Sequence, residues 1–95
     1  MEIQIQHDPD RQQFFAVVEG QRSVLDYERV DEGTLDYRST VVAAELRNRG
    51  IGHRLAEHAL DYAKANGYKV IPSCPFVAAV VEENEEYAEL VAASG

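Results

Sequence analysis

The feature that most constrains the fold of this chain is a change in the spacing of its apolar residues near Ala44. Before that point apolar and polar residues alternate, as they do in half-buried β-strands. Turn-forming residues divide this part into four short runs, and the short loops between them favour an antiparallel meander. We expect strands near residues 3–5, 14–18, 24–30 and 35–42, with turns at 7–10, 19–21 and 31–33.

Beyond Ala44 the apolar residues fall three and four positions apart, as they do along one face of a helix. We expect this helix over about residues 50–66, because Asn66-Gly67 is a typical C-terminal stop and glycine readily takes the left-handed cap conformation. A strand over residues 69–73 follows at once. A strand, a helix and a second strand form a right-handed crossover, so the fourth and fifth strands are expected to pair in parallel.

The last part of the chain is expected to be helical. Proline is tolerated in the first turn of a helix, so Pro75 can precede a short helix over residues 76–81. Residues 82–91 are expected to add a further turn or two. The fold class is therefore α+β, with a mixed and mostly antiparallel sheet, a crossover helix and a C-terminal helix. A chain of 95 residues has room for one domain, which we expect to span residues 1–95.

The overall charge excludes several classes of partner. Nine Lys and Arg residues against seventeen Asp and Glu residues give a net charge of −8 with His neutral. A surface this acidic repels phosphate backbones and anionic lipids, so neither a nucleic acid nor a membrane is an expected partner. No apolar run approaches the roughly 18 residues of a membrane span, and the first residues lack the features of a signal peptide. With one cysteine and no metal-ligand spacing, we expect a cytoplasmic protein without a metal site.

One basic segment is an exception in this acidic chain. Residues 47–54 carry three arginines and no acid, and they contain the pattern Arg47-x-x-Gly50-x-Gly52 between an expected strand and an expected helix. Glycines let the backbone approach a bound group closely, and the unpaired N–H groups of a helix start favour phosphate or pyrophosphate. The segment is neither a dinucleotide fingerprint nor a P-loop, because the further glycine and the Gly-Lys-Ser/Thr are missing. The alternative is that the glycines merely form a turn and the arginines are solvated.

The second feature is Pro72-Ser73-Cys74-Pro75, at the end of the expected fifth strand. The carboxyl ends of parallel strands lie on one rim of a sheet, so Cys74 is expected near the basic segment. A thiol at a helix start can have a lowered pKa and act as an acid or a nucleophile. A free cysteine can equally pack as a small hydrophobic residue. The sequence leaves both interpretations open.

Two blocks of sequence together carry a resemblance to a known family. The first block consists of Thr40-Val41-Val42, Leu46-Arg47-Asn48-Arg49-Gly50-Ile51-Gly52, Leu55 and Ala59-Leu60-Asp61-Tyr62-Ala63. The second block is Lys69-Val70-Ile71-Pro72-Ser73-Cys74-Pro75-Phe76-Val77. In these blocks the chain resembles the acetyl-CoA-dependent GNAT N-acetyltransferases, and in particular their smallest, single-domain branch. The similarity extends over residues 35–91.

The resemblance implies a splayed sheet that grips acetyl-CoA between the fourth and fifth strands. Backbone groups of residues 40–42 would pair with the pantetheine arm, and amides of residues 49–54 would hold the pyrophosphate. A strand N–H near Val41 would stabilise the oxyanion that develops when an amine attacks the thioester. The expected acetyl-CoA-binding residues are Thr40, Val41, Val42, Arg47, Asn48, Arg49, Gly50, Ile51, Gly52, His53 and Arg54.

The resemblance also implies catalytic positions. Cys74 is expected beside the thioester, where it would return a proton to the leaving thiolate or take the acetyl group itself. Ser39 is the second candidate, because it stands where members of this branch often carry His, although a serine cannot act as a general base near neutral pH. The leading hypothesis is a minimal N-acetyltransferase whose acceptor is an unidentified amine of a protein or a polyamine. The alternative is a CoA-binding regulatory or interaction module without significant catalysis.

Overall fold

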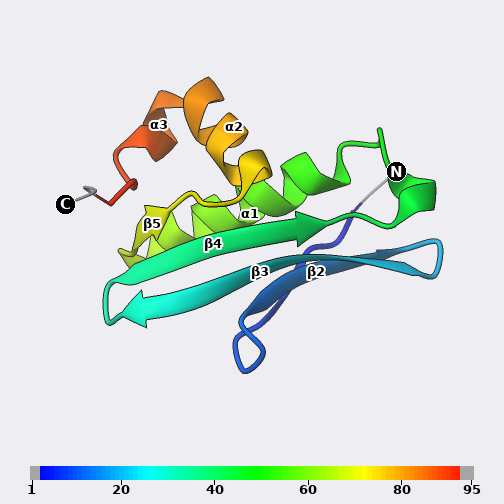
Figure 1. Cartoon of the computed structure of the whole chain (residues 1–95), viewed down its shortest axis with the longest axis horizontal. Coiled ribbons are helices and arrows are strands. Elements are labelled where there is room, and N and C mark those ends of the chain that lie inside the picture. The colour runs from blue at the N-terminus through cyan, green and yellow to red at the C-terminus, as the bar shows by residue number, and fades with distance from the viewer. Residues whose placement is uncertain (1–2, 93–95) are drawn as a thin grey trace.

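The computed structural model describes residues 3–92, which form one five-stranded sheet with helices packed on it (Figure 1). The expected domain also includes residues 1–2 and 93–95, which lie outside this range, so a single domain over residues 1–95 stays a prediction. The strands follow one another in space in their chain order, and only the last pair is parallel. The strands are β1 (Gln6–Asp8), β2 (Gln13–Val18), β3 (Gln21–Asp31), β4 (Thr34–Val41) and β5 (Lys69–Ile71).

The crossover between β4 and β5 is the predicted helix. A short 3₁₀ turn, η1 (Ala44–Leu46), precedes α1 (Ile51–Asn66), and β5 is followed by α2 (Pro75–Glu83) and α3 (Glu85–Ala88). α1 stops at Gly67, whose φ of 74° is the left-handed conformation that glycine adopts without steric cost. The antiparallel meander, the parallel last pair and the C-terminal helices are thereby confirmed, and α2 is longer than the expected 76–81.

The prediction for the first strand is wrong. Residues 3–5 are not in a strand, and β1 instead includes His7 and Asp8, which the sequence had suggested as a turn. The physical reason is the side chain of His7: its ring stacks on Phe14 at 4.2 Å between centroids, and its Nε2 lies 2.6 Å from the Tyr27 hydroxyl. These contacts draw His7 into the sheet, and the chain turns only afterwards, where the Gln12 N–H donates to the Pro9 carbonyl.

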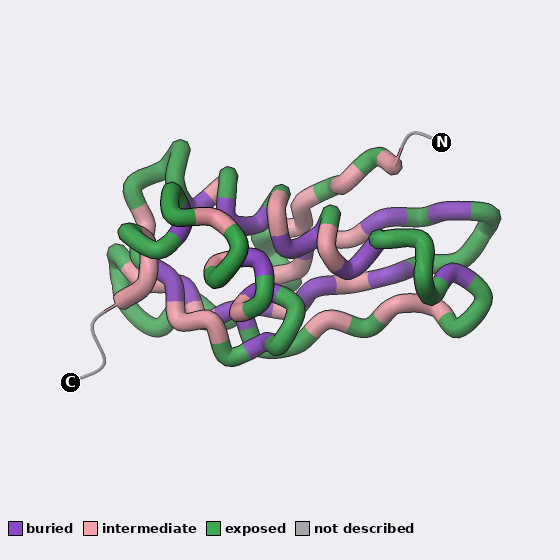
Figure 2. The backbone as a smooth tube through the Cα atoms, turned by 90° about the horizontal axis from the view of Figure 1, so that it is seen from above, coloured by how far each residue is buried: buried purple, intermediate pink, exposed green. Residues whose placement is uncertain are grey.

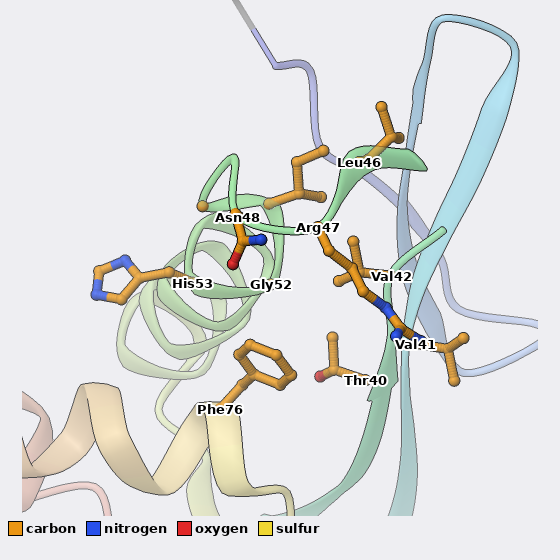
Figure 3. Close-up of a pocket in the computed structure, with 11 residues that line it drawn as sticks. Thr40, Val41, Val42, Leu46, Arg47, Asn48, Gly52, His53 and Phe76 are labelled. Carbon is orange, nitrogen blue, oxygen red and sulfur yellow. The ribbon is translucent and has the colours of Figure 1, made fainter. Parts of the chain in front are cut away.

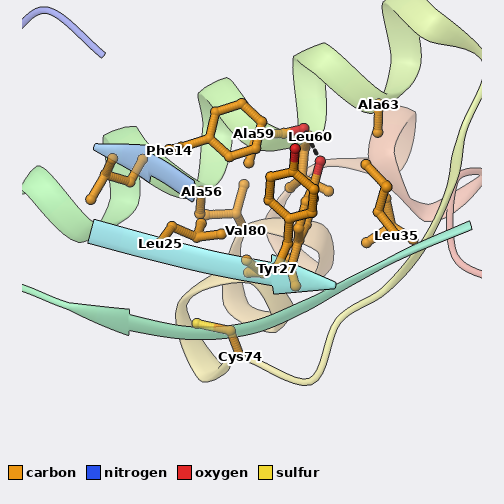
Figure 4. Close-up of a cluster of buried hydrophobic side chains, with 14 of the residues drawn as sticks. Phe14, Leu25, Tyr27, Leu35, Ala56, Ala59, Leu60, Ala63, Cys74 and Val80 are labelled. Carbon is orange, nitrogen blue, oxygen red and sulfur yellow. Dashed lines mark hydrogen bonds between the residues drawn. The ribbon is translucent and has the colours of Figure 1, made fainter. Parts of the chain in front are cut away.

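The core lies between one face of the sheet and α1. Side chains of Phe14, Leu25 and Leu35 point from the strands toward Ala56, Ala59 and Leu60 of the helix (Figure 4). Buried residues alternate with partly buried or exposed ones along β2 and along residues 23–27 of β3 (Figure 2), so each strand presents one face to this core. α2 and α3 contribute Val77, Val80 and Tyr87 to the same hydrophobic cluster. Within residues 3–92, the opposite face of the sheet therefore carries no helix.

A one-residue bulge in β4 changes which side chains face the helices. Asp26 pairs with Ser39 and Tyr27 pairs with Tyr37, so Arg38 is an extra residue without a partner on β3. Side chains of paired residues lie on the same face. Ser39 therefore lies with Asp26 on the outer face, and Thr40, the partner of Leu25, faces the helices.

β4 and β5 separate soon after they pair. Their register ends at Asp36 and Ile71, and one further link follows, in which the Cys74 N–H donates to the Tyr37 carbonyl at 2.8 Å. The chain then turns into α2, while β4 continues to Val41. The end of β4 is left with a free edge on its β5 side within the described residues, and this is the splayed sheet that the resemblance implied.

The buried hydroxyl of Tyr37 offers a test of this packing. It donates to the Ala59 carbonyl of α1 and so links β4 to the crossover helix. We expect Tyr37→Phe to lower the free energy of unfolding by about 1 kcal/mol, the usual net value of such a bond. Thermal unfolding should then occur about 4–8 °C lower. Tyr68→Phe, at the half-buried edge of the sheet, should lower the free energy of unfolding by less than half as much. An equal loss in both variants would show that the hydrogen bond from Tyr37 to Ala59 does not stabilise the fold.

Candidate functional site

A pocket of about 590 Å³ opens where β4 and β5 have separated. One wall is the free end of β4, the second is the loop and first turn of α1, and the third is Phe76 of α2 (Figure 3). The lining consists of Thr40, Val41, Val42, Leu46, Arg47, Asn48, Gly50, Ile51, Gly52, His53 and Phe76.

The start of α1 supplies unpaired amides to this pocket. The first intrahelical bond is donated by the Arg54 N–H to the Gly50 carbonyl, so the N–H groups of Ile51, Gly52 and His53 precede it. No side chain caps the helix, and its first turn carries no acid. Gly50 has a φ of 75°, which is strained for any residue with a Cβ. Loop geometry and helix dipole together favour an anion at this end of the pocket.

Only one of the three arginines in the basic segment lines the pocket. Arg47 does so, and within residues 3–92 it forms no salt bridge. Arg49 is paired with Glu19 at 2.6 Å. Arg54 is exposed and lies in a separate hollow with Glu57. Of the three arginine charges, the pocket can therefore offer an anion that of Arg47.

The ring of Phe76 sits directly on Gly52. A Cβ at position 52 would come within 2.6 Å of the ring, so only glycine permits this contact. Phe76 is nevertheless 43% exposed, because its other side faces the pocket and Thr40 (Figure 3). Gly52 thus has a packing role that the sequence did not suggest: it admits the aromatic wall of the pocket.

Cys74 lies behind the pocket wall rather than in it. Its side chain is fully buried, and its Sγ is 3.1 Å from the Thr40 hydroxyl oxygen. Thr40 lines the pocket and Cys74 does not. The thiol is thus packed in the interior, which is one of the two interpretations that the sequence left open. It is also hydrogen-bonded to the Thr40 hydroxyl, which faces the pocket.

The second candidate catalytic residue lies elsewhere. Ser39 is exposed on the outer face of the sheet, outside the pocket lining. The bulge at Arg38 is the reason, because it moves Ser39 to the side of Asp26.

His53 stands at the rim of the pocket between two carboxylates. Its Nδ1 is 3.1 Å from Glu57 and its Nε2 is 3.1 Å from Glu83, so it connects α1 with α2. Both ring nitrogens can donate only in the imidazolium form. The hydrogen bond to Glu83 and, to a smaller extent, the interactions with Glu57 raise the pKa of His53 above its usual 6.5.

The pocket brings together most of the residues expected to bind acetyl-CoA. Arg49 and Arg54 are the expected residues outside its lining. Leu46 and Phe76 also line the pocket and were not expected from the sequence. Phe76 was visible only as an aromatic residue next to Pro75 in a helical first turn, and nothing in the sequence placed it against Gly52.

Residues 3–92 contain no group of three His, Cys, Asp or Glu side chains arranged to hold a metal ion. None of the helices formed by these residues is long and apolar enough to cross a membrane.

The chain is similar to known proteins in sequence and in fold. Residues 13–90 match the family model described as GCN5-related N-acetyl-transferase. The chain is 36% identical over 84 residues to Protein NATD1 of Xenopus tropicalis, covering 86% of this chain and 77% of that protein. It is 36% identical over 84 residues to Protein NATD1 of Homo sapiens, covering 86% and 74%. A GCN5-like protein from Staphylococcus aureus, solved in solution by NMR, has a similar fold, with a TM-score of 0.68, 24% identity and coverage of 99% and 90%.

The ion pairs of His53 predict a pH-dependent contact between α1 and α2. Because the pKa of His53 in the folded protein is raised above 6.5, its stabilising contribution is fully present below that pH and is lost as pH rises through the raised pKa. The contribution should stay below about 1 kcal/mol, since His53 is 45% exposed and water and salt screen it.

An NMR titration of the imidazole ring protons would measure this pKa directly. We expect Glu83→Gln to lower the pKa of His53, because it removes the largest cause of the shift. Glu82→Gln is the matched control, with the same change of charge one residue away, and it should have a much smaller effect. A pKa of His53 that is the same in both variants would contradict the contact.

Proposed function

Because the chain belongs to the GCN5-related N-acetyltransferase family, we propose that its pocket binds acetyl-CoA and that the protein transfers the acetyl group to an amine. The observation that carries this proposal is the make-up of the pocket. An anion-binding end, with the amides of α1 and Arg47, is continuous with the free edge of β4, which leads to Thr40 and Cys74. A cosubstrate with a pyrophosphate at one place and a thioester some distance along an extended arm fits such an arrangement.

The anion end would hold the pyrophosphate. The N–H groups of Ile51, Gly52 and His53 have no intrahelical acceptor, so phosphate oxygens can take those bonds without displacing any within the helix. Arg47 adds a full charge in a chain whose net charge is −8. Asn48, with a φ of 70°, shapes the loop so that it turns into the helix.

The free edge of β4 would hold the pantetheine arm. Strand backbone that has lost its neighbour presents N–H and C=O groups, and an amide-containing arm can pair with them as a further strand would. Val41 follows Thr40 at this end of β4, so its side chain lies on the outer face of the sheet and is 62% exposed. A backbone N–H in this segment would stabilise the oxyanion as the amine attacks the thioester.

The acceptor amine would approach from the outer face of the sheet, where no helix lies within residues 3–92. This face carries carboxylates beside the splay: Asp36 accepts a bond from Ser73, and Asp26 accepts one from Gln13. Ser39 offers no imidazole there, so the acceptor must arrive as the free amine or lose its proton to water. Its chemical class, a protein amine or a polyamine, stays open.

The alternative function is a module that binds CoA without significant catalysis. The exposed Ser39, outside the pocket and without the chemistry of a general base, is the observation that favours it. Binding of acetyl-CoA without accelerated release of CoA would support the module, whereas turnover would support the transferase.

Calorimetric titration with acetyl-CoA tests the proposed site. We expect Arg47→Gln to weaken binding by about 1–3 kcal/mol, the size of a charge-assisted contact. Arg54→Gln is the matched control, because it removes the same charge from the same segment but outside the pocket, and it should change the affinity less than about twofold. Equal losses in the two variants would mean that only net charge matters, and an unmeasurable affinity of the unmodified protein would refute the proposed function.

A further inference from the structure

This inference rests on the proposed function and concerns the proton that the reaction delivers to sulfur. We infer that the hydroxyl of Thr40 is the group that contacts the reacting sulfur of CoA, and that it passes the proton of the Cys74 thiol to that sulfur. Thr40 is then a catalytic residue, and Cys74 acts through it.

Thr40 lies between the pocket and the thiol of Cys74. Its side chain lines the pocket and faces Phe76 across it (Figure 3). Its hydroxyl oxygen is 3.1 Å from the Cys74 Sγ, and Thr40 is the side-chain hydrogen-bond partner of that thiol. The thiol itself is fully buried and does not line the pocket. A proton that moves between Cys74 and a ligand in the pocket therefore has the Thr40 oxygen in its path.

The backbone holds Cys74 in this position from both sides. Its N–H donates to the Tyr37 carbonyl at 2.8 Å, and its carbonyl accepts from the Ala78 N–H at 2.9 Å as α2 begins. The residue is thus fixed at the junction of the sheet and the helix. A thiol held behind the wall is poorly placed to take an acetyl group, and well placed to exchange a proton with the hydroxyl in front of it.

The bulge in β4 is what turns Thr40 toward Cys74. If Arg38 were paired regularly with β3, strict alternation from Leu35 and Tyr37 would direct Ser39 to the helix side and Thr40 outward. With the bulge, Thr40 pairs with Leu25 and faces the core side.

The chemical step balances. As the C–S bond of the thioester breaks, its electron pair goes to sulfur. The Thr40 O–H gives its proton to that sulfur while the Thr40 oxygen takes the proton of the Cys74 S–H. The acylated nitrogen loses one proton to water, and water returns one to Cys74 through Thr40 once CoA has left the pocket. One N–H is exchanged for one S–H, and no oxidant or reductant is needed.

The first test measures binding rather than activity. A hydroxyl that donates to sulfur stabilises the thiolate of bound CoA, which can be followed by ultraviolet absorbance against pH, with desulfo-CoA as the reference ligand that lacks the thiol. We expect the thiolate of bound CoA to form at a pH about one unit lower in the wild-type protein than in Thr40→Val. Thr40→Ser should retain the effect, because it keeps the hydroxyl. Thr34→Val is the matched control on the same strand and should behave as the wild type.

The second test is a double-mutant cycle on the release of CoA from acetyl-CoA, with spermidine as the acceptor. We expect Thr40→Val and Cys74→Ala each to slow release at least about tenfold, and the double variant to be no slower than the slower single variant, because both residues act in one relay. The affinity for acetyl-CoA should change less than about threefold in all three variants.

Each other outcome overturns the inference. Identical titrations of bound CoA in the wild type and in Thr40→Val would overturn it, as would losses of rate that multiply in the double variant. A protein that binds acetyl-CoA but releases CoA no faster than buffer does, with spermidine and also with a lysine-containing peptide, would overturn it as well, while leaving the CoA-binding module intact. If calorimetry shows no binding of either CoA or acetyl-CoA by the wild type, the proposed function itself fails.

Discussion

The hydrogen bond from the Cys74 N–H to the Tyr37 carbonyl is the last link between the two parallel strands, and the site depends on it. It ends the pairing of β4 with β5 and sets the position at which α2 begins. From there, Phe76 in the first turn of α2 meets Gly52 in the first turn of α1. The pocket therefore forms because the two strands stop pairing at this point. Its walls are the end of β4, the start of α1 and the first turn of α2.

The bulge at Arg38 determines which hydroxyl group of β4 faces the helices. A β-strand alternates its side chains strictly, so one inserted residue exchanges the faces of all that follow it. In β4 the exchange places the Ser39 hydroxyl outside and the Thr40 hydroxyl inside, against the only cysteine of the chain. The one unpaired position thus decides which of these two adjacent hydroxyl residues faces the helices.

The three arginines of the basic segment lie in different surroundings. In a strand–helix junction neighbouring side chains point in different directions, so three arginines close in sequence do not share one site. Arg49 binds Glu19, Arg54 follows the exposed side of α1, and Arg47 is left to line the pocket. The fixed contribution to anion binding comes from the backbone of α1, whose amides have no other acceptor within the helix.

The sequence by itself determined the strand and helix periods, the stop at Gly67, the parallel crossover and the segment around Arg47 and Gly50, because each of these depends on local spacing or on backbone conformation. It did not determine the first strand, which His7 joins through contacts with Phe14 and Tyr27. Nor did it determine the bulge in β4, the contact of Phe76 with Gly52 or the burial of Cys74 behind Thr40. These were decided only by the tertiary structure, because each depends on the packing of residues distant in sequence, and no local pattern records which distant side chain will fill a given space.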